Sequence, residues 1–183
     1  MKKIIIIITI LIANLAFSQI AIGKAAISTL ADNVTPNPNI SLEFGMGNKG
    51  IILPWVTSAA GVTSAVPGTI IFDTTDYKIK VKLAASWKDL TIDTNGAADT
   101  SLQNSLTDQN TAKTVIGSNA GTDNTPGILV LKDTDKAMVL PKMASPHLNI
   151  KNPAPGMMAY DTSTKQLAVF NGLEFLEIEL LYT

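Results

Sequence analysis

Apolar and polar residues alternate along residues 78–83 in the way that a half-buried β-strand requires. The run is Lys-Ile-Lys-Val-Lys-Leu, which gives one charged face and one apolar face. The preceding residues 69–74 are rich in Ile, Thr and Phe, which are common in strands, and Thr75-Asp76 predicts a turn. We therefore predict a β-hairpin here.

A second hairpin is predicted near the end of the chain, with strands at residues 157–162 and 166–170. Both faces of the returning strand are apolar, so this hairpin should be the more deeply buried of the two. Asn171-Gly172 is a strong turn signal and predicts the start of a last strand over residues 173–182.

The two hairpins belong to a longer repeat, displaced by 87 to 88 positions. Phe72-Asp73-Thr74 corresponds to Tyr160-Asp161-Thr162, and another aromatic residue, Trp87 or Phe175, follows each of these aromatics after 15 residues. Upstream, both copies carry a Lys, an aliphatic run and a Leu-Pro pair. Self-similarity at a fixed spacing indicates a repeated structural unit. The repeated Asp is expected to cap its own turn.

The repeat predicts the domain organisation. A first β-rich unit is expected over residues 19–90 and a second over residues 127–183. Residues 91–126 are polar and lack aromatics, which predicts a linker, with a short helix around Leu102 and Leu106. An isolated two-stranded hairpin is marginal in water, so these strands need cover from another unit or another chain. The predicted fold is therefore mainly β, with the two units intertwined in a homotrimer.

The first 18 residues have the pattern of an export signal. Lys2 and Lys3 precede an apolar run over residues 4–17, and Ala16-Phe17-Ser18 supplies small residues for cleavage. Cleavage would leave Gln19 first. The alternative is a retained membrane anchor, although the run is shorter than the roughly 20 residues of a spanning helix.

Composition narrows the function further. The chain has no Cys and one His, which excludes a disulfide framework, a thiol nucleophile and a Cys-rich zinc site. Two of the 14 lysines lie in the export signal, so the remaining 12 lysines and 15 acidic residues give a net charge of −3. This charge gives no attraction to nucleic acid. Large apolar groups are few, which favours an elongated or oligomeric surface protein over a globular enzyme, and we expect no cofactor.

Several patterns raise the possibility of a chemical site. Residues 45–50 fit G-x-G-x-x-G, but a dinucleotide site needs a following helix, and Ile51-Ile52-Leu53-Pro54 predicts none. His147 could serve a Ser-His-Asp triad, but no G-x-S-x-G elbow is present. An ordinary loop histidine is favoured.

Carboxylates offer two further alternatives. Asp133 and Asp135 could share a cation, although Ca²⁺ needs six to eight oxygen ligands. Glu174, Glu177 and Glu179 crowd the last strand, and two carboxylates can hydrolyse glycosides. A solvated strand face formed by Glu177 and Glu179 is the better explanation. We therefore predict no catalytic residue and no metal site.

Lys78, Lys80 and Lys82 are the most suggestive surface feature. At a period of two they project from one strand face, roughly 7 Å apart. Such a row could bind an anionic polysaccharide. The favoured alternative is edge protection, in which lysines keep a sheet edge from pairing with other strands.

The repeat resembles one found in exported proteins of Bacteroidetes, with the pattern K-G-x-x-L-P, P-G-x-x-Y-D-T and Y-N-G-x-W. The first copy offers residues 49–54, residues 67–74 and Trp87, and the second offers Tyr160-Asp161-Thr162 and Phe170-Asn171-Gly172. Proteins with this repeat are similar to phage tail-fibre proteins. The resemblance implies a β-rich, trimeric, fibre-like surface protein, and it carries over no catalytic residue.

These observations predict an exported structural or adhesive protein rather than an enzyme. It is expected outside the cell or on the outer-membrane surface of a Gram-negative bacterium, where it would act by multivalent binding to surface glycans. The alternative is an accessory subunit that docks on an outer-membrane protein complex by adding a strand to an exposed edge.

Overall fold

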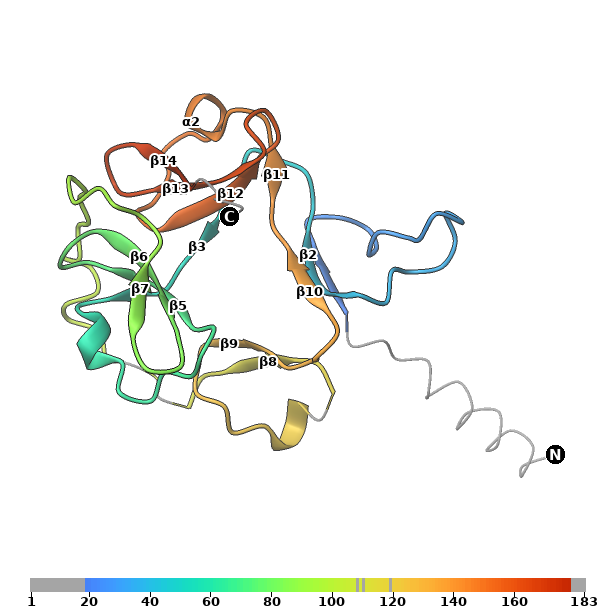
Figure 1. The fold of residues 1–183 in the computed structure, drawn as a ribbon, viewed down its shortest axis with the longest axis horizontal. Helices are drawn as coiled ribbons and strands as arrows, with labels where there is room; N and C mark the ends of the chain where they lie inside the picture. Colours follow the sequence, from blue (N-terminus) through green and yellow to red (C-terminus); the bar gives the residue numbers. More distant parts are fainter. Residues whose placement is uncertain (1–18, 108, 110, 119, 179–183) are drawn as a thin grey trace.

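The protein is mainly β, as predicted, in the computed structural model, which describes residues 19–178 apart from residues 108, 110 and 119 (Figure 1). The first half of the chain forms β1 (Ile20–Ile22), β2 (Ile40–Phe44), β3 (Ile51–Ile52), β4 (Trp55–Val56), β5 (Ile70–Asp73), β6 (Lys78–Lys82) and β7 (Trp87–Asp89). The second half forms β8 (Thr114–Ile116), β9 (Leu129–Leu131), β10 (Ala137–Val139), β11 (Lys142–Met143), β12 (Met157–Asp161), β13 (Gln166–Phe170) and β14 (Phe175–Ile178). Short helical turns complete the described elements: η1 (Ala59–Gly61), η2 (Ala120–Thr122) and α2 (Pro146–Asn149).

Both predicted hairpins are confirmed, as β5–β6 and β12–β13, and they lie in sheets of one design. The first sheet has the order β4-β5-β6-β7, and the second contains the path β11-β12-β13-β14. In each, the first pair of strands is parallel and the next two pairs are antiparallel. The register is also shared, since Trp55 lies opposite Phe72 and Lys142 lies opposite Tyr160. The two copies of the sequence repeat therefore build the same four-stranded unit.

The repeated Asp caps the hairpin turn, as the sequence predicted. An Oδ1 atom of Asp73 accepts a hydrogen bond from the Thr75 amide at 3.0 Å, and Asp161 accepts one from the Ser163 amide at 2.7 Å. Each carboxylate thus satisfies a backbone donor that the tight turn leaves without a strand partner.

The two units share one hydrophobic core. Phe72 and Ile79 of the first hairpin, exposed by 0% and 1%, pack in one cluster with Met158 and Val169 of the second. Strand β3 also joins the second unit directly, because it pairs antiparallel with β12. The Trp55 Nε1 atom donates to the Pro155 carbonyl oxygen at 2.6 Å. Each hairpin therefore receives part of its cover from the other unit.

Two further sheets are parallel and lie beside this shared core (Figure 1). Strands β1, β2 and β10 form one, which brings residues 20–44 together with residues 137–139. Strands β8 and β9 form the other. Strand β8 falls inside the predicted linker, residues 91–126, and the helix predicted around Leu102 and Leu106 is wrong, because residues 101–105 form turns.

Two predictions extend past the described residues. The last strand begins at Phe175, two residues later than predicted, and its expected continuation over residues 179–182 lies outside them. The predicted export signal, residues 1–18, also lies outside them. Within the described part of the chain, no helix has the length and apolar character needed to cross a membrane.

Candidate functional site

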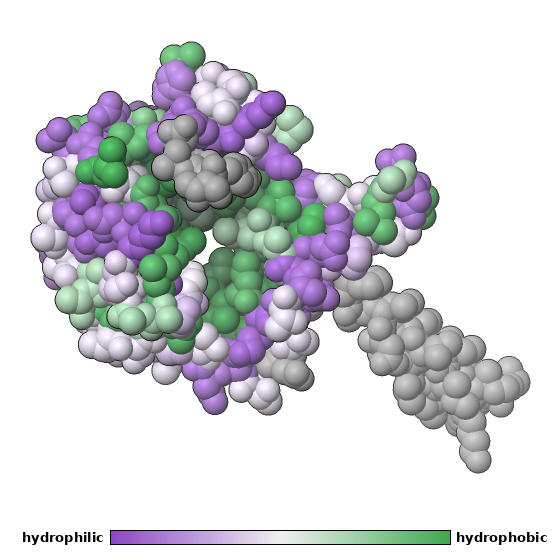
Figure 2. All heavy atoms as spheres, in the orientation of Figure 1, coloured by the Kyte–Doolittle hydropathy of each residue, from purple (hydrophilic) through white to green (hydrophobic). Residues whose placement is uncertain are grey.

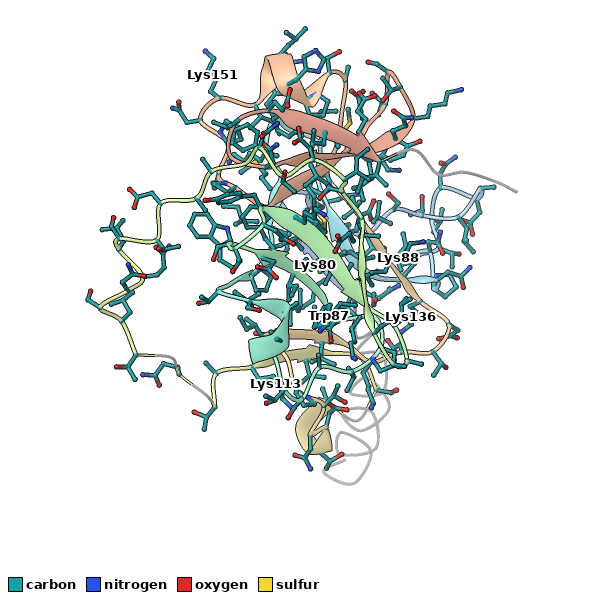
Figure 3. All side chains as sticks on the ribbon, turned by 60° about the vertical axis from the view of Figure 1, so that its left-hand side comes forward. Lys80, Trp87, Lys88, Lys113, Lys136 and Lys151 are labelled. Carbon is teal, nitrogen blue, oxygen red and sulfur yellow. The ribbon has the colours of Figure 1, made fainter. Side chains whose placement is uncertain are left out.

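The lysine row lies on β6, and the chain itself supplies partners for it. Lys78 Nζ lies 2.8 Å from a carboxylate oxygen of Asp89. Lys80 Nζ, on a side chain that is only 13% exposed, lies 2.9 Å from Asp73 and 2.6 Å from Asp76 (Lys80 is labelled in Figure 3). These carboxylates already neutralise two of the three cations, so less of the row's charge is available to an external anion than the sequence implied.

Lys82 has a different partner. Its Nζ atom lies 5.9 Å from the centre of the Trp87 ring, a cation–π distance, and the two residues face each other across β6 and β7. Edge protection, the favoured alternative for the row, is wrong because β6 lies between β5 and β7. Binding of an anionic ligand by the row stays a prediction.

Asp73 is the centre of a buried polar network in the first unit. It is 2% exposed, and its Oδ2 atom accepts from the Ala59 amide and from Lys80 Nζ, both at 2.9 Å. Burial raises the pKa of this carboxyl, but the hydrogen bonds from Lys80, Ala59 and Thr75 outweigh it and hold the pKa below its usual value. The network therefore fixes η1 against the end of β5 and has no free acid or base for catalysis.

The equivalent network in the second unit lacks its cation. Asp161 is 1% exposed and accepts from the amides of Ser145 and Ser163, but its Oδ2 atom has no hydrogen-bond partner. Ala168 stands where the first unit has Lys80. Burial raises the pKa of Asp161, and the backbone donors outweigh this effect, so the pKa is again lowered. The second unit is thus the more apolar version of the same design.

The parallel strands form the candidate assembly surface. Parallel sheets normally have both faces covered, and two strands alone make a marginal sheet. Nevertheless, β8 and β9 have no other strand partner among the described residues, and Ile128, just before β9, and Leu129, its first residue, are 66% and 46% exposed. On β1, Ile20 and Ile22 are 40% and 48% exposed. Further polypeptide is needed to bury these residues.

The open middle of the molecule points to the same conclusion. Figure 2 shows a hollow there, with hydrophobic residues along its walls. In Figure 1 the strands around it are β2 and β10 on one side, β8 and β9 below, and β3 and β5 opposite. We call β1, β2, β8, β9 and β10 the parallel-strand surface.

The other residues considered for a chemical site are not brought together with the groups that such a site would need. Residues 45–50 lead into a strand, β3, rather than the helix of a dinucleotide site. His147 is exposed in α2 rather than in a loop. Asp133 is engaged by the Ser118 amide and Lys136 Nζ, which hold its pKa at about 2. Among the described residues, no group of three His, Asp or Glu side chains could hold a metal ion, and Asp135 gains no such neighbours.

Sequence reasoning missed a depression in the second unit. It has a volume of about 570 Å³, and Phe170, Phe175, Glu174 and His147 are among its lining residues. The sequence pattern offers Glu174 only as one of three carboxylates crowding the last strand and His147 only as a triad member, and neither pattern indicates a pocket. The repeated aromatic at Trp87 and Phe175 was the signal that could have located it, because it marks one position in both units.

Comparison with protein families gives one match. Residues 116–180 match the family model described as "Phage tail like trimerisation region". The match covers about a third of the chain and includes strands β9 to β14. It supports a tail-fibre-like structural protein that forms homo-oligomers. Neither the curated proteins nor the solved structures give a match.

Proposed function

We propose that the chain is an exported, homotrimeric, tail-fibre-like protein that acts as a structural and adhesive module on the surface of a Gram-negative bacterium. The observation that carries the proposal is the match of residues 116–180 to a phage tail-like trimerisation region. The residue pattern shared with exported Bacteroidetes repeat proteins supports the same function, and so does the export-signal pattern of residues 1–18.

The uncovered parallel strands supply the physical reason for assembly. Strands β9 and β10 lie inside the matched region, and both belong to the parallel-strand surface. Burial of apolar surface contributes roughly 25 cal/mol per Å², so side chains as exposed as Leu129 favour association when three chains cover one another. Several weak contacts on one trimer would then raise the apparent affinity for a surface glycan.

The test is the mass of the exported protein. The full chain, expressed in a Gram-negative host, is expected to start at Gln19 and to have the mass of three chains in native mass spectrometry. Leu129→Asp places three charges at the proposed interface and is expected to give monomers, while Leu106→Asp, at a 73% exposed position outside the parallel strands, should remain trimeric. A wild-type protein that is monomeric at all concentrations would refute the trimer, and an intact N-terminus in the cytoplasm would refute export.

An accessory subunit of an outer-membrane protein complex is the second candidate. Within the described residues, β1 is an edge strand of its sheet, and an edge can accept a strand from another protein. Purification from the cell envelope separates the two functions, since a stoichiometric membrane-protein partner would favour the accessory subunit.

A further inference from the structure

The depression in the second unit lies where β13, β14 and α2 meet. We call it the Phe170–Phe175 pocket. Its volume of about 570 Å³ is in the range of small-molecule sites, and both apolar and polar groups form its walls. It lies at the end of the molecule where Figure 1 labels α2 and β14. None of its residues belongs to the parallel-strand surface.

Two aromatic rings line the pocket. Phe170 and Phe175 lie directly opposite each other in neighbouring strands, with ring centroids 5.2 Å apart and planes tilted by 48°. Phe175 also packs against the buried cluster of Met143, Ile150 and Ala159, which holds its ring in place. The rings therefore provide a fixed apolar platform that is still partly exposed to solvent.

Polar groups with no internal partner stand on the rim. Glu174 and His147 are exposed, and in the described part of the chain no hydrogen bond or ion pair engages either side chain. The Glu174 backbone amide donates to Asn171 Oδ1 at 2.9 Å, which fixes the position of the residue in the turn. The pocket thus combines an aromatic surface with one carboxylate and one imidazole that can bond to a ligand.

The first unit shows that the fold does not require this arrangement. Lys82 and Trp87 occupy the positions of Phe170 and Phe175, and the Lys82 ammonium group lies over the Trp87 ring. The residues before Trp87 are Ala85 and Ser86, where the second unit has Leu173 and Glu174. The open aromatic pair and its acidic rim are therefore specific to the second unit, although both units share a backbone design.

We infer that the Phe170–Phe175 pocket binds a neutral pyranose sugar, which makes it the glycan-contacting site of the proposed adhesive protein and rests on that function. The apolar face of a pyranose ring can lie on the phenylalanine rings, and its hydroxyl groups can donate to the Glu174 carboxylate. His147 offers one donor and one acceptor for neighbouring hydroxyls. An acidic sugar is disfavoured because its carboxylate would lie close to that of Glu174.

Binding is tested with the full-length protein and the methyl glycosides of glucose, galactose, mannose and N-acetylglucosamine, observed by saturation-transfer NMR. At least one glycoside is expected to bind with a Kd of about 1 mM, as befits a small open site. Glu174→Gln keeps the size of an exposed side chain, and Phe175→Leu keeps an apolar residue without the ring. Each is expected to weaken binding by roughly tenfold or more, equivalent to about 1.4 kcal/mol.

Two control variants show whether binding depends on this pocket alone. Trp87→Leu removes the equivalent ring of the first unit and should leave glycoside binding unchanged, as should Leu148→Ala, which lies in α2 but does not line the pocket. The inference is overturned if no glycoside binds at about 50 mM, or if Glu174→Gln and Phe175→Leu bind as the wild type does. It is also overturned if Leu173→Asp changes the oligomeric mass, because a second chain would then cover the pocket. A trimer without glycoside binding would refute the pocket and leave the assembly intact.

Discussion

Asparagine substitutions at Asp73 and Asp161 should reveal how the two repeats differ. Both carboxylates occupy the same position in the same four-stranded unit, and both are almost fully buried. Their surroundings differ most in charge, because Lys80 of the first unit is replaced by Ala168 in the second. We expect Asp73→Asn to destabilise the protein much more than Asp161→Asn.

The hydrogen bonds of Asp73 indicate how much unfolding free energy the Asp73→Asn substitution should remove. In Asp73→Asn the amide group has one acceptor oxygen for the Ala59 amide, the Thr75 amide and Lys80 Nζ, which now contact two carboxylate oxygens at 2.9 to 3.0 Å. Removing one partner of a buried ion pair costs about 3–5 kcal/mol. Lys80 keeps its second contact, to Asp76, so we expect the lower end, about 3 kcal/mol.

Asp161→Asn should lower the unfolding free energy by less than Asp73→Asn does. The Oδ2 atom of Asp161 accepts no hydrogen bond, so the amide nitrogen can replace it, while Oδ1 keeps its donors from Ser145 and Ser163. The remaining loss is the charge on two hydrogen bonds, about 1 kcal/mol in total.

Urea unfolding followed by tryptophan fluorescence measures both values, at one protein concentration because assembly contributes to stability. Asp89→Asn is the matched control: its carboxylate is 42% exposed and pairs with Lys78, so the cost should stay below about 1 kcal/mol. Equal losses for Asp73→Asn and Asp161→Asn would show that the Lys80 contact does not distinguish the two units.

Three other measurements test separate parts of the structure. Lys132 and nearby donors hold the pKa of Asp123 at about 2, below its ordinary value near 4. The ionised Asp123 carboxylate should therefore stabilise the fold fully above pH 5, and this contribution should disappear as the pH falls towards 2. Asp123→Asn should weaken this acid dependence in urea titrations. Gly156→Ala should lower the melting temperature more than Gly68→Ala. Both glycines have a left-handed backbone, but only at Gly156 would the new Cβ lie 2.9 Å from Phe72; equal shifts in melting temperature would contradict this. Trp55→Phe removes a hydrogen bond between the units and should cost about 1 kcal/mol of unfolding free energy, and an unchanged value would count against that contact.

The two hairpins of the fold could be predicted from the sequence because their signals are local. Alternation along residues 78–83 locates β6, and the matching Asp-Thr pairs locate both hairpin turns. The repeat displacement predicts that the two units correspond, and their registers do correspond. Each hairpin depends only on neighbours within about ten residues along the chain.

The parallel pairings could not be predicted in the same way. Strand β2 pairs with β10, almost a hundred residues further along the chain, and β10 has only 3 residues, too few to carry a distinctive pattern. The ion pairs of the lysine row were missed for a related reason. Asp73 and Asp89 become neighbours of β6 only after the sheet has formed, so a period of two predicts the charged face but not its partners.

The side-chain differences between the two units indicate that units with the same backbone arrangement have different roles. The first unit closes its sheet with buried ion pairs and covers its Trp87 ring with Lys82, so it offers few unsatisfied groups to other molecules. The second unit replaces these lysines by Ala168 and Phe170, leaves an aromatic pocket open, and lies inside the trimerisation match. Since the scaffold needs neither set of residues to form its strands, the substitutions are free to serve contacts outside the unit. This is why the second unit, rather than the lysine row of the first, is where we expect a ligand to bind.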